Sequence, residues 1–165
     1  MVSFCDGGMA SLYIQLIQMG YNVKRYIAVE NDPKCRELAD AICPVMDRCL
    51  GHDITLVSLE ALDEIDELDV IVATPECQSF SGRQDNARGF GDIAGTRTFV
   101  CSATCFKHLC RKFPSARAMF ENTQVSGKNG EAWKAEQERL QEELIGGREM
   151  TDRQAIDYGS AHSRN

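Results

Sequence analysis

A cysteine in a polar loop is the residue of this sequence best suited to nucleophilic chemistry. Cys77 stands in the run Thr-Pro-Glu-Cys-Gln-Ser-Phe-Ser, residues 74–81, with Arg83 a few positions further on. Hydroxyl, amide and guanidinium groups around a thiol favour the reactive thiolate. The alternative for Cys77 is a buried structural cysteine, which is our interpretation of most of the other cysteines.

A second reactive group follows another apolar run. Glu121 and Asn122 come directly after residues 116–120, which are predicted to form a strand. A carboxyl group there could act as a general acid or base, and its alternative is a helix cap or a turn residue. Together with Cys77 it would suit thiolate attack on an electron-poor ring carbon, assisted by protonation of the ring.

A third group of residues suggests a nucleoside site. Gly7 and Gly8 lie between a strand pattern and a helix pattern, where glycine lets the backbone approach a ligand closely. Glu30 ends the next strand pattern, the usual place for an acid that accepts from ribose hydroxyls. Asp53 could accept from an adenine amino group, although a helix N-cap or turn is the favoured alternative. For the glycines and Glu30, a tight turn and a surface acid are an equally open alternative.

These residues need a scaffold that brings them together, and apolar patterning predicts one. Strands are expected at residues 1–4, 25–29, 45–49, 69–73, 116–120 and 150–158, and helices at residues 9–19, 33–42, 98–111 and 131–144. A loop is expected from residue 74 to about residue 95, and Asp32 and Pro33 mark a helix start. Alternating strands and helices imply an α/β fold with a parallel sheet, whose carboxyl ends carry ligand sites.

Composition favours one soluble globular domain. The chain has 165 residues, of which 43% are hydrophobic and 26% charged. It contains no apolar run long enough for a transmembrane helix, and residues 1–6 do not resemble a signal peptide. We therefore expect a protein of the cytoplasm, or of the nucleus if the source is eukaryotic.

Cysteine spacing and charge exclude several classes of function. The eight cysteines form no C-x-x-C pair and there are three histidines, so neither a metal site nor a disulfide framework is expected. The net charge of −7 argues against a free-standing nucleic-acid binder. Residues 60–69 hold acids and no base, whereas residues 82–97 hold three arginines, so any nucleic-acid contact should lie in the second stretch.

In their order along the chain, these motifs resemble those of cytosine-C5 DNA methyltransferases. Residues 6–8 resemble the first S-adenosylmethionine motif, residues 29–32 the ribose-binding segment, and residues 51–55 the Gly-Asp-Ile-Thr motif. Residues 75–81 resemble the Pro-Pro-Cys-Gln-x-Phe-Ser nucleophile loop, residues 120–123 the Glu-Asn-Val motif, and residues 157–164 the Asp-Tyr-Gly-x-Pro-Gln-x-Arg segment. The resemblance implies a Rossmann-like S-adenosylmethionine-dependent methyltransferase fold, with residues 1–165 as a partial catalytic domain.

The resemblance also implies a role for each matching residue. Cys77 would attack C6 of cytosine, Glu121 would protonate N3, Asn122 would order the loop that carries Cys77, and Arg164 would hold the ring intermediate. The implied S-adenosylmethionine site comprises Cys5, Asp6, Gly7, Gly8, Met9, Glu30, Asn31, Asp53, Ile54 and Pro75. The implied DNA contacts are Gln78, Ser79, Ser81, Arg83 and Arg88.

The implied substrate is double-stranded DNA with the target cytosine flipped out of the helix. The family's target-recognition region follows the last matched motif, so we expect it in a second chain or in a missing C-terminal half. A tRNA cytosine-C5 methyltransferase is an alternative, because that relative shares the cysteine and Glu-Asn motifs. A catalytically incomplete regulatory or remnant subunit is another, favoured by Glu76 where the family has a second proline.

Overall fold

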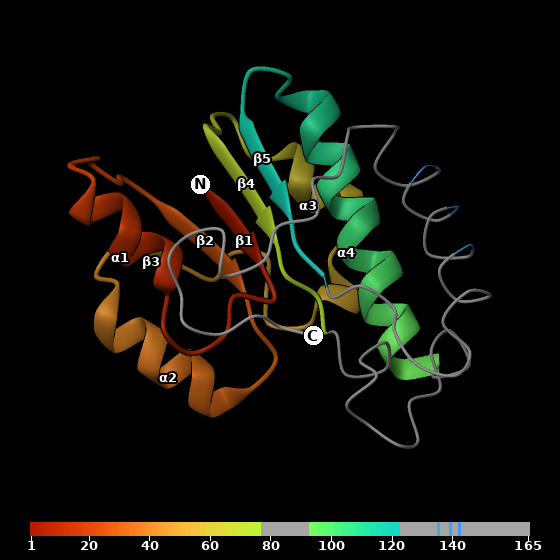
Figure 1. Ribbon diagram of the computed structural model, residues 1–165, viewed down its shortest axis with the longest axis horizontal. Coiled ribbons are helices and arrows are strands. Elements are labelled where there is room, and N and C mark those ends of the chain that lie inside the picture. Colours follow the sequence, from red (N-terminus) through yellow and green to blue (C-terminus); the bar gives the residue numbers. More distant parts are fainter. Residues whose placement is uncertain (77–92, 123–134, 136–138, 140–141, 143–165) are drawn as a thin grey trace.

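The centre of the fold is a parallel β-sheet (Figure 1). The computed structural model describes residues 1–76, 93–122, 135, 139 and 142. Within them, five strands lie in the order β3-β2-β1-β4-β5, and every neighbouring pair is parallel. The strands are β1 (Val2–Phe4), β2 (Tyr26–Val29), β3 (Met46–Asp47), β4 (Val70–Ala73) and β5 (Arg117–Phe120). All five expected strands in this part of the chain are confirmed, β3 being shorter than expected.

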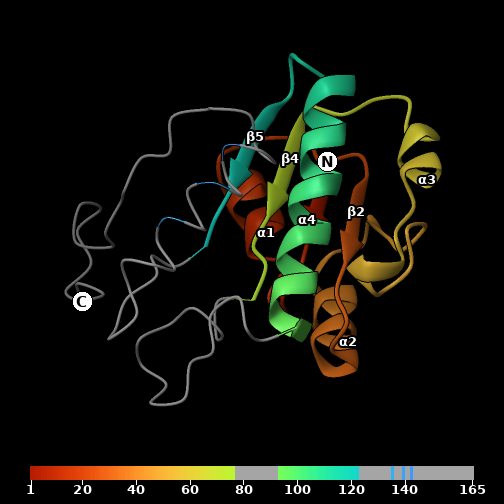
Figure 2. The ribbon, with the colours of Figure 1, turned by 90° about the vertical axis from the view of Figure 1, so that its right-hand side faces the viewer.

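Helices cover both faces of this sheet (Figures 1 and 2). On one face lie α1 (Ser11–Gln18) and α2 (Pro33–Ile42); on the other lie α3 (Leu59–Asp63) and α4 (Ile93–Lys112), with the short 3-10 helix η1 (Ile54–Leu56) before α3. The protein therefore has an α/β fold that is compatible with a Rossmann-like arrangement.

Strand periodicity divides the core into two clusters. In β2, Ile27 and Val29 belong to a large cluster with α3 and α4, whereas Tyr26 and Ala28 belong to a smaller cluster with α2. Successive side chains of a strand point to opposite faces, which explains this division. All four side chains are buried, as the unbroken apolar run requires when both faces are covered.

Local signals placed most helix ends correctly. The Asp32 carboxylate accepts from Lys34 N at 2.8 Å and from Cys35 N at 3.3 Å, and Pro33 is the first residue of α2, so the predicted cap is confirmed. The structure differs in two places: α4 begins at Ile93 rather than at residue 98, and α3 was not expected. No helix among the described residues is long and apolar enough to span a bilayer.

Two expected elements fall mostly or wholly beyond this part of the chain. Of the helix expected at residues 131–144, the structure describes Ala135, Arg139 and Glu142, which are all helical and exposed. The strand expected at residues 150–158 lies outside the described residues.

The order of the strands creates a switch point beside β1. After β3 at one edge, the chain crosses β2 and β1 and continues as β4 on the other side of β1. Thr74 ties the two central strand ends together, because its N–H donates to Phe4 O at 3.1 Å and its hydroxyl donates to Cys5 O at 2.7 Å. Ligands of open α/β sheets bind outside the carboxyl ends at such a point.

Candidate functional site

The loop between β1 and α1 lies at this switch point and is strained. Cys5 (φ 59°) and Ala10 (φ 42°), the two non-glycine residues with positive φ in the described part of the chain, both lie in it. Residues other than glycine rarely adopt such backbone angles, and each residue held in this conformation costs about 1–3 kcal/mol. Gly7 also has a positive φ, of 69°, which glycine adopts without that cost. The fold thus holds this loop in one particular shape.

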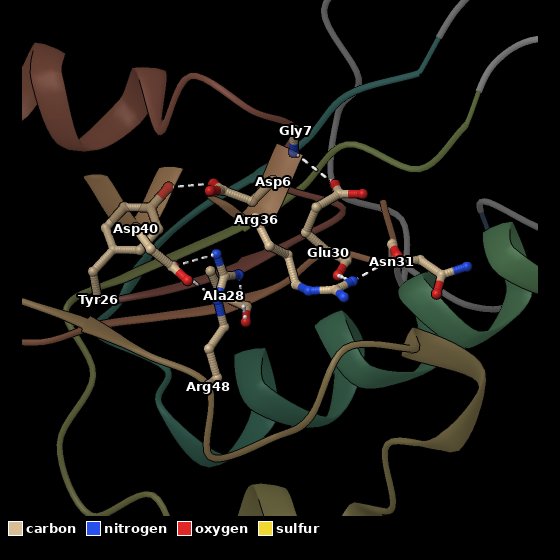
Figure 3. A network of polar contacts seen from close by, with 9 residues as sticks. All are labelled: Asp6, Gly7, Tyr26, Ala28, Glu30, Asn31, Arg36, Asp40 and Arg48. Carbon is tan, nitrogen blue, oxygen red and sulfur yellow. Dashed lines mark hydrogen bonds and ion pairs between the residues drawn. The ribbon is translucent and has the colours of Figure 1, made fainter. Parts of the chain in front are cut away.

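Glu30 links the loop to the end of β2. Its Oε2 accepts from Gly7 N at 2.8 Å (Figure 3). Its Oε1 accepts from Asp32 N at 2.8 Å. An ionised carboxylate has about four lone-pair sites, so roughly two remain for a ligand. Gly7 and Glu30, which the sequence paired as parts of one site, are therefore in direct contact.

Gly8 has a different neighbour from the one expected. A Cβ at this position would lie 3.2 Å from Cys35 Cα and 3.3 Å from Cys35 Sγ, in the first turn of α2. Close packing between the loop and α2 therefore accounts for a glycine at this position. No ligand is needed to explain it.

Cys5 offers a neutral thiol rather than a reactive one. Its Sγ lies 3.6 Å from the hydroxyl of Ser102, a buried residue of α4. Burial raises the pKa of the Cys5 thiol to about 11, and the carboxylates of Glu30 and Glu76 add to that increase. The thiol therefore stays protonated at neutral pH and contributes to packing and polarity.

The side chain of Asp6 turns away from Glu30 and lies against Tyr26 (Figure 3). Its Oδ1 accepts from the Tyr26 hydroxyl, whereas its Oδ2 is buried and has no hydrogen-bond partner among the described residues. Burial raises the pKa of this carboxyl; hydrogen bonds from Tyr26 and Ser3 and the charge of Arg48 oppose that increase. Asp6, expected in the cofactor site, thus supports the loop from beneath.

Arg48 completes the polar network on this face of the sheet. Its guanidinium donates to Asp40 Oδ1 at 2.8 and 3.2 Å and to Ala28 O at 3.1 Å. It thereby connects the segment after β3 to α2 and β2. Neither Tyr26 nor Arg48 was predicted from the sequence. The signal for Tyr26 was a tyrosine inside an apolar strand, whose hydroxyl needs a partner when buried.

The remaining residues of the expected cofactor site divide into exposed and buried ones. Met9 and Asn31 are exposed, and Asn31 O accepts from Arg36 at 2.6 Å. Asp53 Oδ1 accepts from Thr55 N at 2.8 Å and caps η1, which confirms the favoured alternative. The side chain of Ile54 is buried in the core, so it faces away from solvent.

The ends of β4 and β5 meet at the same edge. Glu121 N donates to Ala73 O at 2.9 Å, and Asn122 Nδ2 donates to Pro75 O at 3.4 Å. The Glu121 side chain is exposed, and Pro75 is buried. Asn122 therefore contacts the chain two residues before Cys77 in the sequence. Other expected site residues lie outside the described residues: Cys77, Gln78, Ser79, Ser81, Arg83, Arg88 and Arg164.

Asp6 makes stability depend on pH in a defined direction. Its pKa is higher in the folded protein than in the unfolded chain, so between the two values the folded state binds more protons. The free energy of unfolding therefore falls as pH rises through that window. Asp6→Asn removes this titration, and its amide oxygen can still accept from Tyr26.

Relative to the unsubstituted protein, Asp6→Asn is thus expected to gain stability from about pH 4 upward. Urea denaturation at a series of pH values measures this difference. Asp66→Asn removes the same charge from an exposed position and serves as the control. A difference between Asp6→Asn and the unsubstituted protein that is constant with pH would contradict the expectation.

No protein-family model matches this sequence, and no curated protein matches it significantly. The case for a function therefore rests on the residues and contacts described above.

Proposed function

We propose that this chain carries the cofactor site and the nucleophile loop of a DNA cytosine-C5 methyltransferase, on a Rossmann-like methyltransferase fold. One observation carries the proposal: two contacts lie at the carboxyl edge of the same parallel sheet. Gly7 N–H binds Glu30 at the ends of β1 and β2, and the Asn122 amide binds Pro75 O at the ends of β5 and β4. The first contact suits a nucleoside ligand, and the second orders the chain that leads to Cys77.

The residues after β1 and β2 fit a ribose. Glu30 is held by two backbone N–H groups and keeps lone pairs for two neighbouring hydroxyl groups. The exposed side chains of Met9 and Asn31 follow the same two strands and could border the nucleoside. S-adenosylmethionine, when bound, would supply an electrophilic methyl group.

The residues after β4 and β5 fit the attack on cytosine. The Cys77 thiolate would form a bond to C6 of a flipped base while Glu121 protonates N3, which makes C5 nucleophilic. C5 then takes the methyl group as the methyl–sulfonium bond breaks and leaves a neutral thioether. Loss of the C5 proton to a base, departure of the thiolate and return of the N3 proton to Glu121 would restore the ring. Glu121 is exposed, so its carboxyl group is available for this task. The contact of Glu121 with Ala73 is made by its backbone N–H. Arg164 would hold the intermediate.

Covalent trapping tests this proposal. The chain, with any coding sequence that continues after Asn165, is incubated with S-adenosylmethionine and duplex DNA that contains 5-fluorocytosine. Fluorine at C5 cannot leave as a proton does, so the enzyme is expected to remain attached to the DNA as a band of raised mass. An adduct with 5-fluorocytosine tRNA instead would favour the tRNA alternative. If neither DNA nor tRNA gives an adduct, a non-catalytic subunit is favoured.

Glu30→Ala tests the cofactor half by itself. Loss of a charge-assisted hydrogen bond costs about 1.5–3 kcal/mol, so the Kd for S-adenosylmethionine is expected to rise about 10–100-fold. Isothermal titration calorimetry measures it. Glu37→Ala, which removes an exposed charge from neighbouring α2, is the control and should leave the Kd within about twofold. Equal affinities of the two variants would remove Glu30 from the site.

A further inference from the structure

Two contacts from β2 hold the loop after β1, one on each side. Gly7 N–H donates to Glu30, which directly follows β2, and the Asp6 side chain accepts from Tyr26, which begins β2. Figure 3 shows that the two contacts diverge, Asp6 toward Tyr26 and Gly7 toward Glu30. Asp6 and Gly7, which are consecutive in a strained loop, are thus held by contacts that point in opposite directions.

The Tyr26 contact is well placed to control the loop. Tyr26 is fully buried, and its ring packs edge-on against Tyr13 with ring centroids 6.1 Å apart. Its hydroxyl therefore has a fixed position, and Asp6 must come to it. The Asp6 backbone is held as well, because its N–H and that of Cys5 both point at Val29 O, at 3.4 and 2.8 Å.

Asp6 receives its hydrogen bond from the neutral hydroxyl of Tyr26, because the nearby cation, Arg48, donates to other groups. Arg48 binds Asp40 and Ala28 O, and neither of these contacts involves the loop (Figure 3). Without the Tyr26 hydroxyl, the buried Asp6 carboxylate would lose the donor to its Oδ1, and the Ser3 hydroxyl would remain as a donor to it. A buried carboxylate that loses one of its donors is costly to keep in place, so Asp6 would leave its position and release the loop.

We propose that Tyr26 is a positioning residue, which acts through Asp6 to hold Gly7 on Glu30 and so sets the affinity of this site for its nucleoside ligand. Taking that ligand to be S-adenosylmethionine rests on the proposed function. Tyr26 itself lies beneath the loop and does not touch the ligand.

Tyr26→Phe tests the proposal, with Tyr13→Phe as the matched control. Both changes remove one hydroxyl from the same aromatic pair and keep both rings, but only the first removes a contact to the loop. For Tyr26→Phe the Kd for S-adenosylmethionine should rise about tenfold or more, as expected when a charge-assisted hydrogen bond is lost. Amide exchange at Gly7, followed by NMR, should become faster. Tyr13→Phe should change neither quantity by more than about twofold.

A double-variant cycle shows whether Tyr26 acts through Asp6. If it does, Tyr26→Phe combined with Asp6→Ala should weaken binding no more than either single change. Asp6→Asn should restore most of the affinity, because its amide oxygen can accept from the Tyr26 hydroxyl. Additive losses in the cycle would overturn the proposal.

The remaining outcomes separate this proposal from the proposed function. A lower melting temperature of Tyr26→Phe with unchanged affinity and unchanged Gly7 exchange would mean that Tyr26 only packs, and would overturn the inference. If the unsubstituted protein does not bind S-adenosylmethionine, the proposed function fails. The exchange rates of the Gly7 amide in the two tyrosine variants still decide whether Tyr26 positions the loop.

Discussion

Replacing Cys77 by serine is expected to abolish the covalent adduct with 5-fluorocytosine DNA and to slow methyl transfer at least about a thousandfold. A hydroxyl at this position would stay protonated at neutral pH and could not attack C6 as a thiolate does. The adduct is measured by denaturing electrophoresis, and methyl transfer by the incorporation of radiolabelled methyl groups into DNA. Binding of S-adenosylmethionine should remain, because Glu30 and the β1–α1 loop are unchanged.

Cys49→Ser is the matched control for this experiment. Cys49 is exposed, and its sulfur accepts from Arg25 at 3.5 Å, a contact that serine can keep. The same substitution there should leave both adduct and methyl transfer intact. An adduct that persists in Cys77→Ser would assign the nucleophile to another residue and would remove the central support for the proposed reaction.

Phe106→Ala is expected to lower the free energy of unfolding by about 3–5 kcal/mol. Phe106 is 3% exposed and packs edge-on against Phe120 of β5, with ring centroids 5.4 Å apart. Phe120 in turn packs against Phe99, with ring centroids 5.6 Å apart, so two rings of α4 hold β5. Removing Phe106 leaves a cavity in the large core cluster and loses one of these aromatic contacts.

Thermal and urea denaturation measure this loss. For a chain of this size the melting temperature should fall by about 6–20 °C. Phe106→Leu keeps most of the buried volume and should lose clearly less stability. If Phe106→Ala cost less than about 1 kcal/mol, α4 would not be held to β5 by this ring. The contact between Asn122 and Pro75 lies just beyond β5, so the same variant should also loosen the predicted nucleophile loop.

Much of the fold could be predicted because its signals are local. Residues 26–29 and 70–73 are apolar runs, and such runs form strands when both faces of a sheet are covered. Asp32 and Pro33 begin α2 because a carboxylate satisfies free N–H groups and proline suits the first turn. Alternation of strands and helices then predicted a parallel sheet. It also predicted that Glu30 and Glu121 would follow strand ends at one edge.

The helix α3 could not be predicted, because its signals are weak without tertiary contacts. The five residues of α3 stand in an acidic stretch, where the Ser58 cap and the buried Leu62 are the main indications. A helix this short depends on packing rather than on propensity. Its partner is α4, through His108, whose Nε2 lies 2.8 Å from Asp63 Oδ1.

What the sequence by itself determined is the order of the elements and the location of Gly7 and Glu30 at the same edge of the sheet, because both follow from apolar periodicity and from the rule that parallel strands end at one edge. The tertiary structure alone decided how the loop between them is held. Cys5 adopts a left-handed conformation, Gly8 packs on Cys35, and Asp6 turns beneath the loop to Tyr26. Each of these features depends on groups far apart in the chain. Local sequence carries no signal for them, because such contacts form only when the sheet brings the groups together.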